Sequence, residues 1–143
     1  NPGSGNVTIR GATIANESYQ VNGTGTLTIE SNAASFATNF TSSALTEAST
    51  LTEVTIGKST NTSNINLNSA IAIAGPITVY GGSIDVNSDL TATGGNILLD
   101  ADTGSALATN DDGVLIAGGV TVQTSTSGNI TIYGRSGNDN KQA

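Results

Sequence analysis

The sequence feature that most constrains the fold is a run of six short triplets between Ser63 and Asp100. In each triplet an apolar residue stands on either side of a middle residue that is often Thr, Asn or Asp. The triplets begin at Ile65, Ile71, Ile77, Ile84, Leu90 and Ile97. Successive starts therefore lie 6, 6, 7, 6 and 7 residues apart, and three triplets span 19 or 20 residues. Because side chains alternate between the two faces of a strand, each triplet predicts a short strand with one buried face.

The junctions between these triplets favour a coil over β-hairpins. They read Asn-Ser-Ala, Ala-Gly-Pro, Tyr-Gly-Gly, Asn-Ser-Asp and Thr-Gly-Gly. Hairpins would need turn pairs such as Asn-Gly at most of them. A repeat of about 20 residues, made of strands and Gly or Asn corners, is typical of a parallel β-helix with a triangular cross-section. We therefore predict an all-β solenoid.

Triplets of the same kind occur along the rest of the chain. They lie at residues 7–9, 27–29, 54–56, 114–116, 120–122 and 130–132, with a weak one at 106–108. We expect residues 1–143 to form one solenoid of about seven rungs, roughly 30 Å long. The exception is a stretch at about 30–53, which contains no Gly and holds both Phe36 and Phe40. We expect there a loop or a long strand that covers one face or one end of the coil, with a short helix as the alternative.

The composition fits a narrow apolar interior. Hydrophobic residues make up 36% of the chain, but aromatic residues only 3%, so the core must be filled by Ile, Val, Leu and Ala. Only 10% of the residues are charged. Such a polar chain is also compatible with a disordered linker, but the regular triplets argue against that reading.

The charges and the missing residue types exclude several classes of function. The net charge is −7, and the cations are only Arg10, Lys58, Arg135 and Lys141, so we expect no binding to nucleic acid or to an anionic membrane. The absence of Cys and His removes disulfides, thiolate metal sites and imidazole chemistry. No apolar run approaches the roughly 20 residues that cross a bilayer, so no membrane insertion is expected. The chain has no initiating Met and no recognisable signal peptide, which suggests a processed product or part of a longer protein.

Three segments carry a resemblance to a known family. GGNILLDADTG, SGNITIYGRSG and GGSIDVNSDLTATGG resemble the repeats of filamentous haemagglutinin-like adhesins, bacterial exoproteins exported by two-partner secretion. The resemblance covers roughly Gly75 to Gly137 and extends poorly into the N-terminal third. It implies a right-handed parallel β-helix that forms the shaft of a surface or extracellular fibre, with no catalytic residues in the shaft.

Four acidic residues raise the question of a metal site. Asp100 and Asp102, with Asp111 and Asp112 nearby, alternate like the oxygen ligands of a calcium loop. A closing Glu is absent, so we favour turn chemistry, with weak calcium binding as the alternative. Ser136 to Asn140 is similar to one unit of a calcium-binding nonapeptide roll, but a single copy lacks its stacked partner. We therefore predict no metal and no cofactor.

An enzyme is the alternative class of function. Parallel β-helices also host polysaccharide lyases and hydrolases, whose acids and bases come from neighbouring rungs. Such a site would have to use Asp85, Asp100 and Asp102. The scattered cations, the absence of His and Trp, and the lack of long excursions other than 30–53 argue against it.

Several residues expected on the outer faces are candidates for contacts. Tyr80 and Tyr133 occur in matching strings, ITVYG and ITIYG, which lie near three rungs apart and are expected to share a face. They suit either packing over a corner, which we favour, or stacking on the sugars of host or matrix glycans. Two further groups lie in middle positions of triplets: Leu98 and Leu115, expected to stack on one face, and Thr78, Thr121 and Thr131. The threonines raise ice binding, but Asn66 and Asp85 interrupt the expected rank. The Asn-x-Ser/Thr strings at Asn6, Asn22, Asn39 and Asn129 are expected by chance in this composition.

The sequence thus supports two hypotheses. The first is a non-catalytic, extracellular or cell-surface β-solenoid that forms a structural or adhesive segment of a bacterial surface fibre. The second is a carbohydrate-active β-helix enzyme. Neither terminus carries a local capping sequence, so the first hypothesis predicts either axial stacking of copies or continuation of a longer chain.

Overall fold

The computed structural model describes residues 3–14, 19–42, 45–47, 49–101, 113–125 and 127–134, and the elements in them are all β-strands. The strands are β1 (Val7–Arg10), β2 (Tyr19–Val21), β3 (Thr26–Glu30), β4 (Phe40–Thr41), β5 (Leu45–Glu47), β6 (Glu53–Ile56), β7 (Ile65–Leu67), β8 (Ile71–Ile73), β9 (Ile77–Tyr80), β10 (Ile84–Val86), β11 (Leu90–Ala92), β12 (Ile97–Ala101), β13 (Val114–Ile116), β14 (Val122–Thr124) and β15 (Ile130–Gly134). All six triplets of the regular stretch form strands, as predicted.

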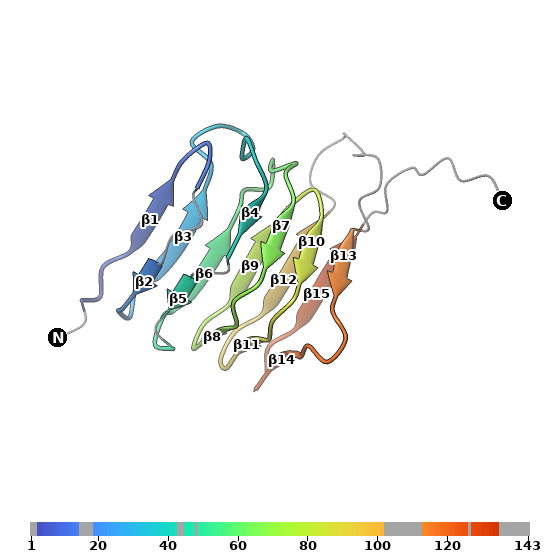
Figure 1. The fold of residues 1–143 in the computed structure, drawn as a ribbon. Helices are drawn as coiled ribbons and strands as arrows, with labels where there is room; N and C mark the ends of the chain where they lie inside the picture. The colour runs from blue at the N-terminus through green and yellow to red at the C-terminus, as the bar shows by residue number, and fades with distance from the viewer. Residues whose placement is uncertain are drawn as a thin grey trace.

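The strands wind into a parallel coil with three faces (Figure 1). The first face is a six-stranded sheet in the order β1-β3-β6-β9-β12-β15, which we call the long sheet. The second is the sheet β4-β7-β10-β13, and the third is made of β2-β5 and of β8-β11-β14, with β5 lying next to β8. Every pairing among the described strands is parallel, and from β3 onwards the chain visits the three faces in turn. In the first rung the chain passes from β1 on the long sheet to β2 on the third face. The predicted parallel β-helix is thereby confirmed.

The register of the long sheet gives the length of each rung. Position by position, Val7 pairs with Leu27, Leu27 with Val54, Val54 with Ile77, Ile77 with Ile97, and Ile97 with Ile130. The rungs that start at Val7 and Ile77 keep the expected repeat, and the other three are longer, the one from Ile97 to Ile130 most of all. The described long sheet therefore holds six stacked strands, against the roughly seven rungs expected from an even repeat.

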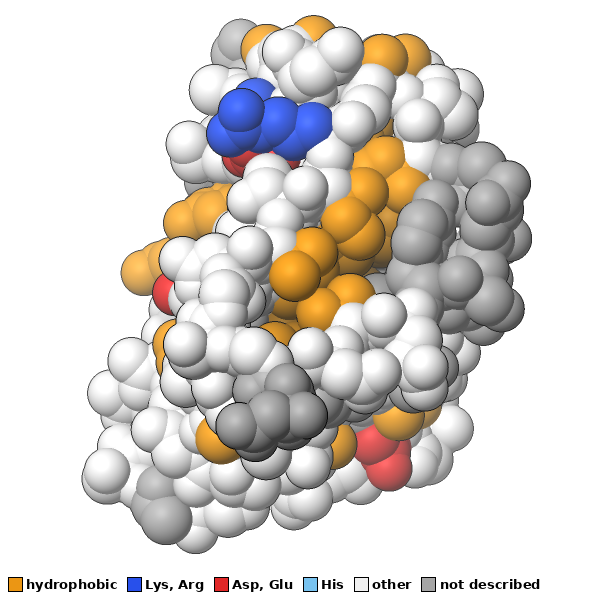
Figure 2. All heavy atoms as spheres, turned by 90° about the vertical axis from the view of Figure 1, so that its left-hand side faces the viewer, with side chains coloured by type: hydrophobic (Ala, Val, Ile, Leu, Met, Phe, Trp, Pro, Cys, Tyr) orange, Lys and Arg blue, Asp and Glu red, His pale blue; other side chains and the backbone are white. Residues whose placement is uncertain are grey.

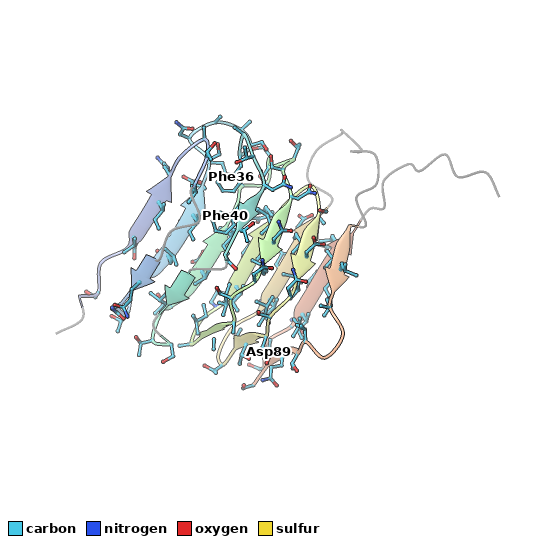
Figure 3. The ribbon with its side chains drawn as sticks, in the orientation of Figure 1. Phe36, Phe40 and Asp89 are labelled. Carbon is cyan, nitrogen blue, oxygen red and sulfur yellow. The ribbon has the colours of Figure 1, made fainter. Side chains whose placement is uncertain are left out.

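Most of the extra residues lie at one corner of the coil, between the long sheet and the sheet β4-β7-β10-β13. We call it the insertion corner. Its connections are residues 31–39, 57–64, 81–83 and 102–113, whereas the other two corners keep connections of three to five residues from β4 onwards. Figure 3 places Phe36 and Phe40 at this corner and Asp89 at the opposite edge of the coil.

The interior is a column of aliphatic side chains. Inward positions of the middle rungs, including Ile77, Ile84, Leu90 and Ile97, are fully buried, and their middle residues point outward. Each inward residue contacts its counterpart in the neighbouring rung because strands in register are only about 4.8 Å apart. Stability thus comes from rung-on-rung burial, as in other solenoids.

The stretch 30–53 departs from the expectation that it covers a face or an end. It contributes β4 and β5 to the second and third faces, and its described residues contain no helix. Phe36 and Phe40 are both 4% exposed and stack on each other, with ring centroids 5.8 Å apart and an interplanar angle of 20°. The two rings belong to the buried core beside the insertion corner instead of capping the coil.

Candidate functional site

The last described rung leaves its apolar row uncovered. Ile130 and Ile132 of β15 are 43% and 44% exposed, although they occupy the same inward positions as Ile97 and Leu99, which are fully buried one rung earlier. Among the described strands, β15 pairs only with β12, β14 only with β11, and β13 only with β10. The outer edges of these three strands therefore carry backbone groups that another strand can pair with.

The first rung has the same character at the other end of the coil. Val7 is 38% exposed, whereas its partner Leu27 is fully buried. Figure 2 looks onto this end and shows apolar side chains gathered across its middle, between polar rims. Ile9 and Ile14 are partly buried against the core below. Both ends of the described coil thus expose interior residues, as the uncapped termini predicted.

Three asparagines that precede strands each accept a hydrogen bond from the next rung, and we call these separate contacts the asparagine ladder. Asn6, Asn39 and Asn96 each stand directly before a strand and accept a backbone N–H from the equivalent position one rung later. The donors are Thr26 at 3.1 Å, Asn64 at 3.4 Å and Asn129 at 2.8 Å. Sequence reasoning missed this role, although the recurrence of Asn before an apolar triplet was a readable signal. Asn6 and Asn39, which the sequence marked only as parts of Asn-x-Ser/Thr glycosylation sequences, therefore form hydrogen bonds between rungs.

A second asparagine with a structural role was also missed. Asn61, in the insertion corner, is 1% exposed. Its Oδ1 accepts from the backbone N–H of Phe36 at 3.1 Å and from the Ser35 hydroxyl at 2.9 Å. Its Nδ2 donates to the backbone carbonyl of Tyr80 at 2.9 Å. One side chain therefore joins three successive rungs, and nothing in the local sequence TNTSN distinguishes it from the other polar turns.

Tyr80 and Tyr133 share a face, as predicted, but they are two rungs apart instead of about three. Asp100 pairs with Tyr80 on one side and with Tyr133 on the other, so the three residues form one outward row of the long sheet, which we call the tyrosine row. The separation differs because the rung from Ile97 to Ile130 is the longest of the coil. Tyr133 is 55% exposed, and Tyr80 is half-buried.

The acidic candidates do not converge in the described structure. Asp85 lies in β10 on the second face, and Asp100 lies in β12 on the long sheet, so the two carboxylates occupy different faces. Asp102, Asp111, Asp112 and Ser136–Asn140, like the weak triplet at 106–108, lie outside the described residues. Within the described ranges, no group of three or more Asp, Glu, His or Cys gathers where a metal ion would be held.

Two expectations about outer faces are wrong. Leu98 belongs to the long sheet and Leu115 to β13 on the second face, so they do not stack. Thr121 precedes a strand instead of occupying its middle position. The strand β14 begins at Val122, and the outward residue there is Gln123. The Thr121 backbone N–H instead donates to Asp89 Oδ1 at 2.8 Å.

A threonine row does exist, on the long sheet. In-register pairs place Thr8, Thr28, Thr55 and Thr78 in one outward row, which Leu98 interrupts before Thr131. Asn66 and Asp85, expected to interrupt it, lie on the second face. The row is one residue wide, and its flanking positions hold residues as different as Arg10, Glu30 and Tyr80, so it is no flat two-rank threonine surface.

Searches with this chain against protein-family models, curated proteins and solved structures give no match. In the portions that the structure describes, no helix is long and apolar enough to cross a bilayer.

Proposed function

We propose that this chain is a non-catalytic shaft segment of an extracellular bacterial surface fibre. The observation that carries the proposal is the change in exposure along one inward row: Ile97 is fully buried, and Ile130, its partner in the last described rung, is 43% exposed. Burial of that row requires a further rung. A coil whose described ends both expose interior residues is suited to continue along its axis, either through more chain or through another copy.

The resemblance of three segments to filamentous haemagglutinin-like repeats supports an extracellular location and a role in a shaft. The chemistry of the surface is compatible with it, since the chain is acidic, carries few charges and has no Cys. The enzyme alternative receives no support from the placement of Asp85 and Asp100 on different faces. Incubation with a panel of polysaccharides tests it directly, and release of reducing or unsaturated sugar ends would overturn the non-catalytic assignment.

The test of the shaft role is sedimentation and electron microscopy of the isolated 143-residue chain. We expect concentration-dependent assemblies that extend along the coil axis, with a diffraction spacing of about 4.8 Å along that axis. A strictly monomeric particle at high concentration would contradict self-association. Continuation into a longer chain would then be tested by the length of the intact polypeptide on a denaturing gel.

The tyrosine row favours a second, adhesive role for the same shaft. Tyr80 and Tyr133 lie on one face about 10 Å apart, because two rung spacings separate them. Aromatic faces stack on sugar rings, and the carboxylate of Asp100 between them is of the kind that accepts hydrogen bonds from sugar hydroxyls. We propose that this row contacts linear glycans. Binding to a glycan array should fall in the Tyr133→Ala variant. It should persist in the control variant Thr28→Ala, which removes an outward side chain of the same sheet. Equal binding by the two variants would contradict glycan contact by the tyrosine row.

A further inference from the structure

We propose that strand β1 of one copy pairs with the open edge of β15 in a second copy, in the register that the long sheet already uses. The proposal rests on the shaft function above and names its partner and contact surface. It makes the long sheet the face that runs without interruption from one copy into the next.

The two edge strands have matching sequences. Residues 6–11 read Asn-Val-Thr-Ile-Arg-Gly, and residues 129–134 read Asn-Ile-Thr-Ile-Tyr-Gly. They differ only by Val for Ile and by Arg for Tyr. Parallel pairing in register would place Val7 on Ile130, Thr8 on Thr131, Ile9 on Ile132 and Arg10 on Tyr133. Each inward residue would then meet an inward residue, as in every described pair of this sheet.

The asparagine ladder selects this register. Asn96 accepts the backbone N–H of Asn129 at 2.8 Å, and Asn6 accepts that of Thr26 at 3.1 Å. Asn129 holds the next position of the same ladder, where no described strand follows. The backbone N–H of Asn6 from a second copy would fill that position with the geometry already seen twice in the long sheet. A shift by one residue would break the ladder and turn Thr8 toward the interior.

The exposed side chains of the two ends are complementary. Val7 on one end and Ile130 and Ile132 on the other are interior residues that stay exposed in the single chain, and the pairing buries them against each other. On the outer face, the Arg10 guanidinium, paired with Glu30 in its own chain, would lie over the 55%-exposed ring of Tyr133. A cation over the face of an aromatic ring is an attractive arrangement.

The ends of two copies can also stack so that β1 of the second copy pairs with β13 instead of β15. Each rung climbs by one strand spacing, so a copy rotated by one face would set β1 on β13 and fill the next step of the coil. With β1 on β15, the described strands leave a gap of one strand on the third face, between β14 and β2 of the second copy, and of two strands on the second face, between β13 and β4 of the second copy. The sequence before β13 is Asp112-Gly113, with no Asn to continue the ladder, and Thr8 would then lie against Leu115. The ladder and the matched threonines favour β15.

Cross-linking of single-cysteine variants distinguishes the two arrangements, because the chain has no Cys of its own. We would mix Thr8→Cys with Thr131→Cys, both outward positions, under mild oxidation. Partners in register lie about 4.8 Å apart between Cα atoms, within the range that a disulfide spans. We expect a mixed disulfide dimer that forms at least about tenfold faster than with Tyr133→Cys, whose Cα would lie about 8 Å from that of residue 8.

The outcomes separate this proposal from the shaft function. Faster cross-linking of Thr8→Cys to Leu115→Cys than to Thr131→Cys overturns the β15 contact while the shaft remains. Axial fibres in the same samples without a Thr8–Thr131 cross-link do the same. Failure of the wild-type chain to assemble at all rejects the contact between copies, and the shaft function is then tested separately by the length of the intact polypeptide.

A charge test adds a readout that does not depend on cysteine chemistry. Tyr133 is on the surface, so its replacement should leave the fold intact, as circular dichroism will show. Tyr133→Lys places a like charge against Arg10 and should raise the critical concentration for assembly, whereas Tyr133→Glu should not. Equal critical concentrations for the two variants would exclude the Arg10–Tyr133 contact.

Discussion

The side chain of Asn61 donates from Nδ2 to the backbone carbonyl of Tyr80, one rung further along the coil, at 2.9 Å. On its other side it accepts the backbone N–H of Phe36 from the preceding rung at 3.1 Å. This buried amide compensates for the irregular backbone of the insertion corner, where the strand ladder is interrupted. Backbone groups that are buried without a partner are costly, so this side chain stabilises the corner, beside the Ser63 hydroxyl, which donates to the Phe36 carbonyl at 2.6 Å.

We predict that Asn61→Ala destabilises the chain by about 2 to 4 kcal/mol, because the Phe36 N–H loses its partner in a buried place and the Tyr80 carbonyl loses one in a partly buried place. Urea unfolding followed by circular dichroism measures the loss. Asn87→Ala is the matched control, since Asn87 is exposed and its Nδ2 donates to the side chain of Asn68 at 2.8 Å. The control should stay within about 0.5 kcal/mol of wild type. A control that loses as much as Asn61→Ala would show that the corner has no special role.

The assignment of inward and outward positions is tested by Ile97 and Thr78, which lie in neighbouring strands of the long sheet. Ile97 is fully buried, so Ile97→Ala should cost about 2 to 5 kcal/mol through lost burial and a cavity. Thr78→Ala removes an outward methyl and hydroxyl and should stay within about 0.5 kcal/mol. Chemical denaturation of both variants checks the difference. Similar losses at the two positions would contradict the register.

Alanine substitutions at two glycines test where the backbones of neighbouring rungs approach closely. A Cβ at Gly75 would clash with the backbone carbonyl of Thr52, one rung before it, whereas a Cβ at Gly118 meets nothing within 4 Å. Gly75→Ala should therefore cost about 1 to 3 kcal/mol through forced backbone movement, and Gly118→Ala less than about 0.5 kcal/mol. Thermal unfolding of the two variants gives the comparison. Equal melting temperatures would mean that the rungs at Gly75 separate without cost.

Removal of divalent cations should leave the fold intact. The described carboxylates form no three-ligand cluster, and Asp100 lies in a strand between Tyr80 and Tyr133. We therefore expect the same melting temperature in EDTA and in millimolar calcium. A large fall with chelator would show that the acidic segment after Asp100 binds calcium as part of the folded coil.

The inward column of the fold could be predicted from the sequence because it depends only on alternation within each triplet. Ile65, Ile84 and Ile97 are buried at the positions that alternation assigned. The strand β14 was displaced by two residues, from the apolar-polar-apolar triplet Val120-Thr121-Val122 to Val122-Gln123-Thr124, which ends on a polar residue. The turn from Ala117 to Val120, with Gly119 at a φ of +83°, decides between them. Alternation alone does not contain that information.

The outward rows could not be predicted because they depend on corner length. The sequence separation of Leu98 and Leu115 is close to one rung of the regular stretch, yet they lie on different faces. Their strands β12 and β13 are consecutive, and the long connection 102–113 at the insertion corner accounts for most of that separation. Tyr80 and Tyr133 were misplaced by one rung for the same reason. The exposure of interior residues at both ends of the described coil agrees with the absence of a local capping sequence. The hydrogen-bond partners of Asn61 could not be predicted, because the local sequence does not distinguish a buried asparagine from an exposed one in a polar turn.

The insertion corner has a consequence for how such a chain can change its length. Connections of three residues and of nine residues join the same two faces there without disturbing the parallel register on either side. Large additions and deletions are therefore accommodated along one longitudinal seam, while connections at the other two corners differ by at most two residues from β4 onwards. A filament built from these rungs would carry all of its variable loops along a single line, so that it presents one changeable flank to its surroundings and two that stay the same.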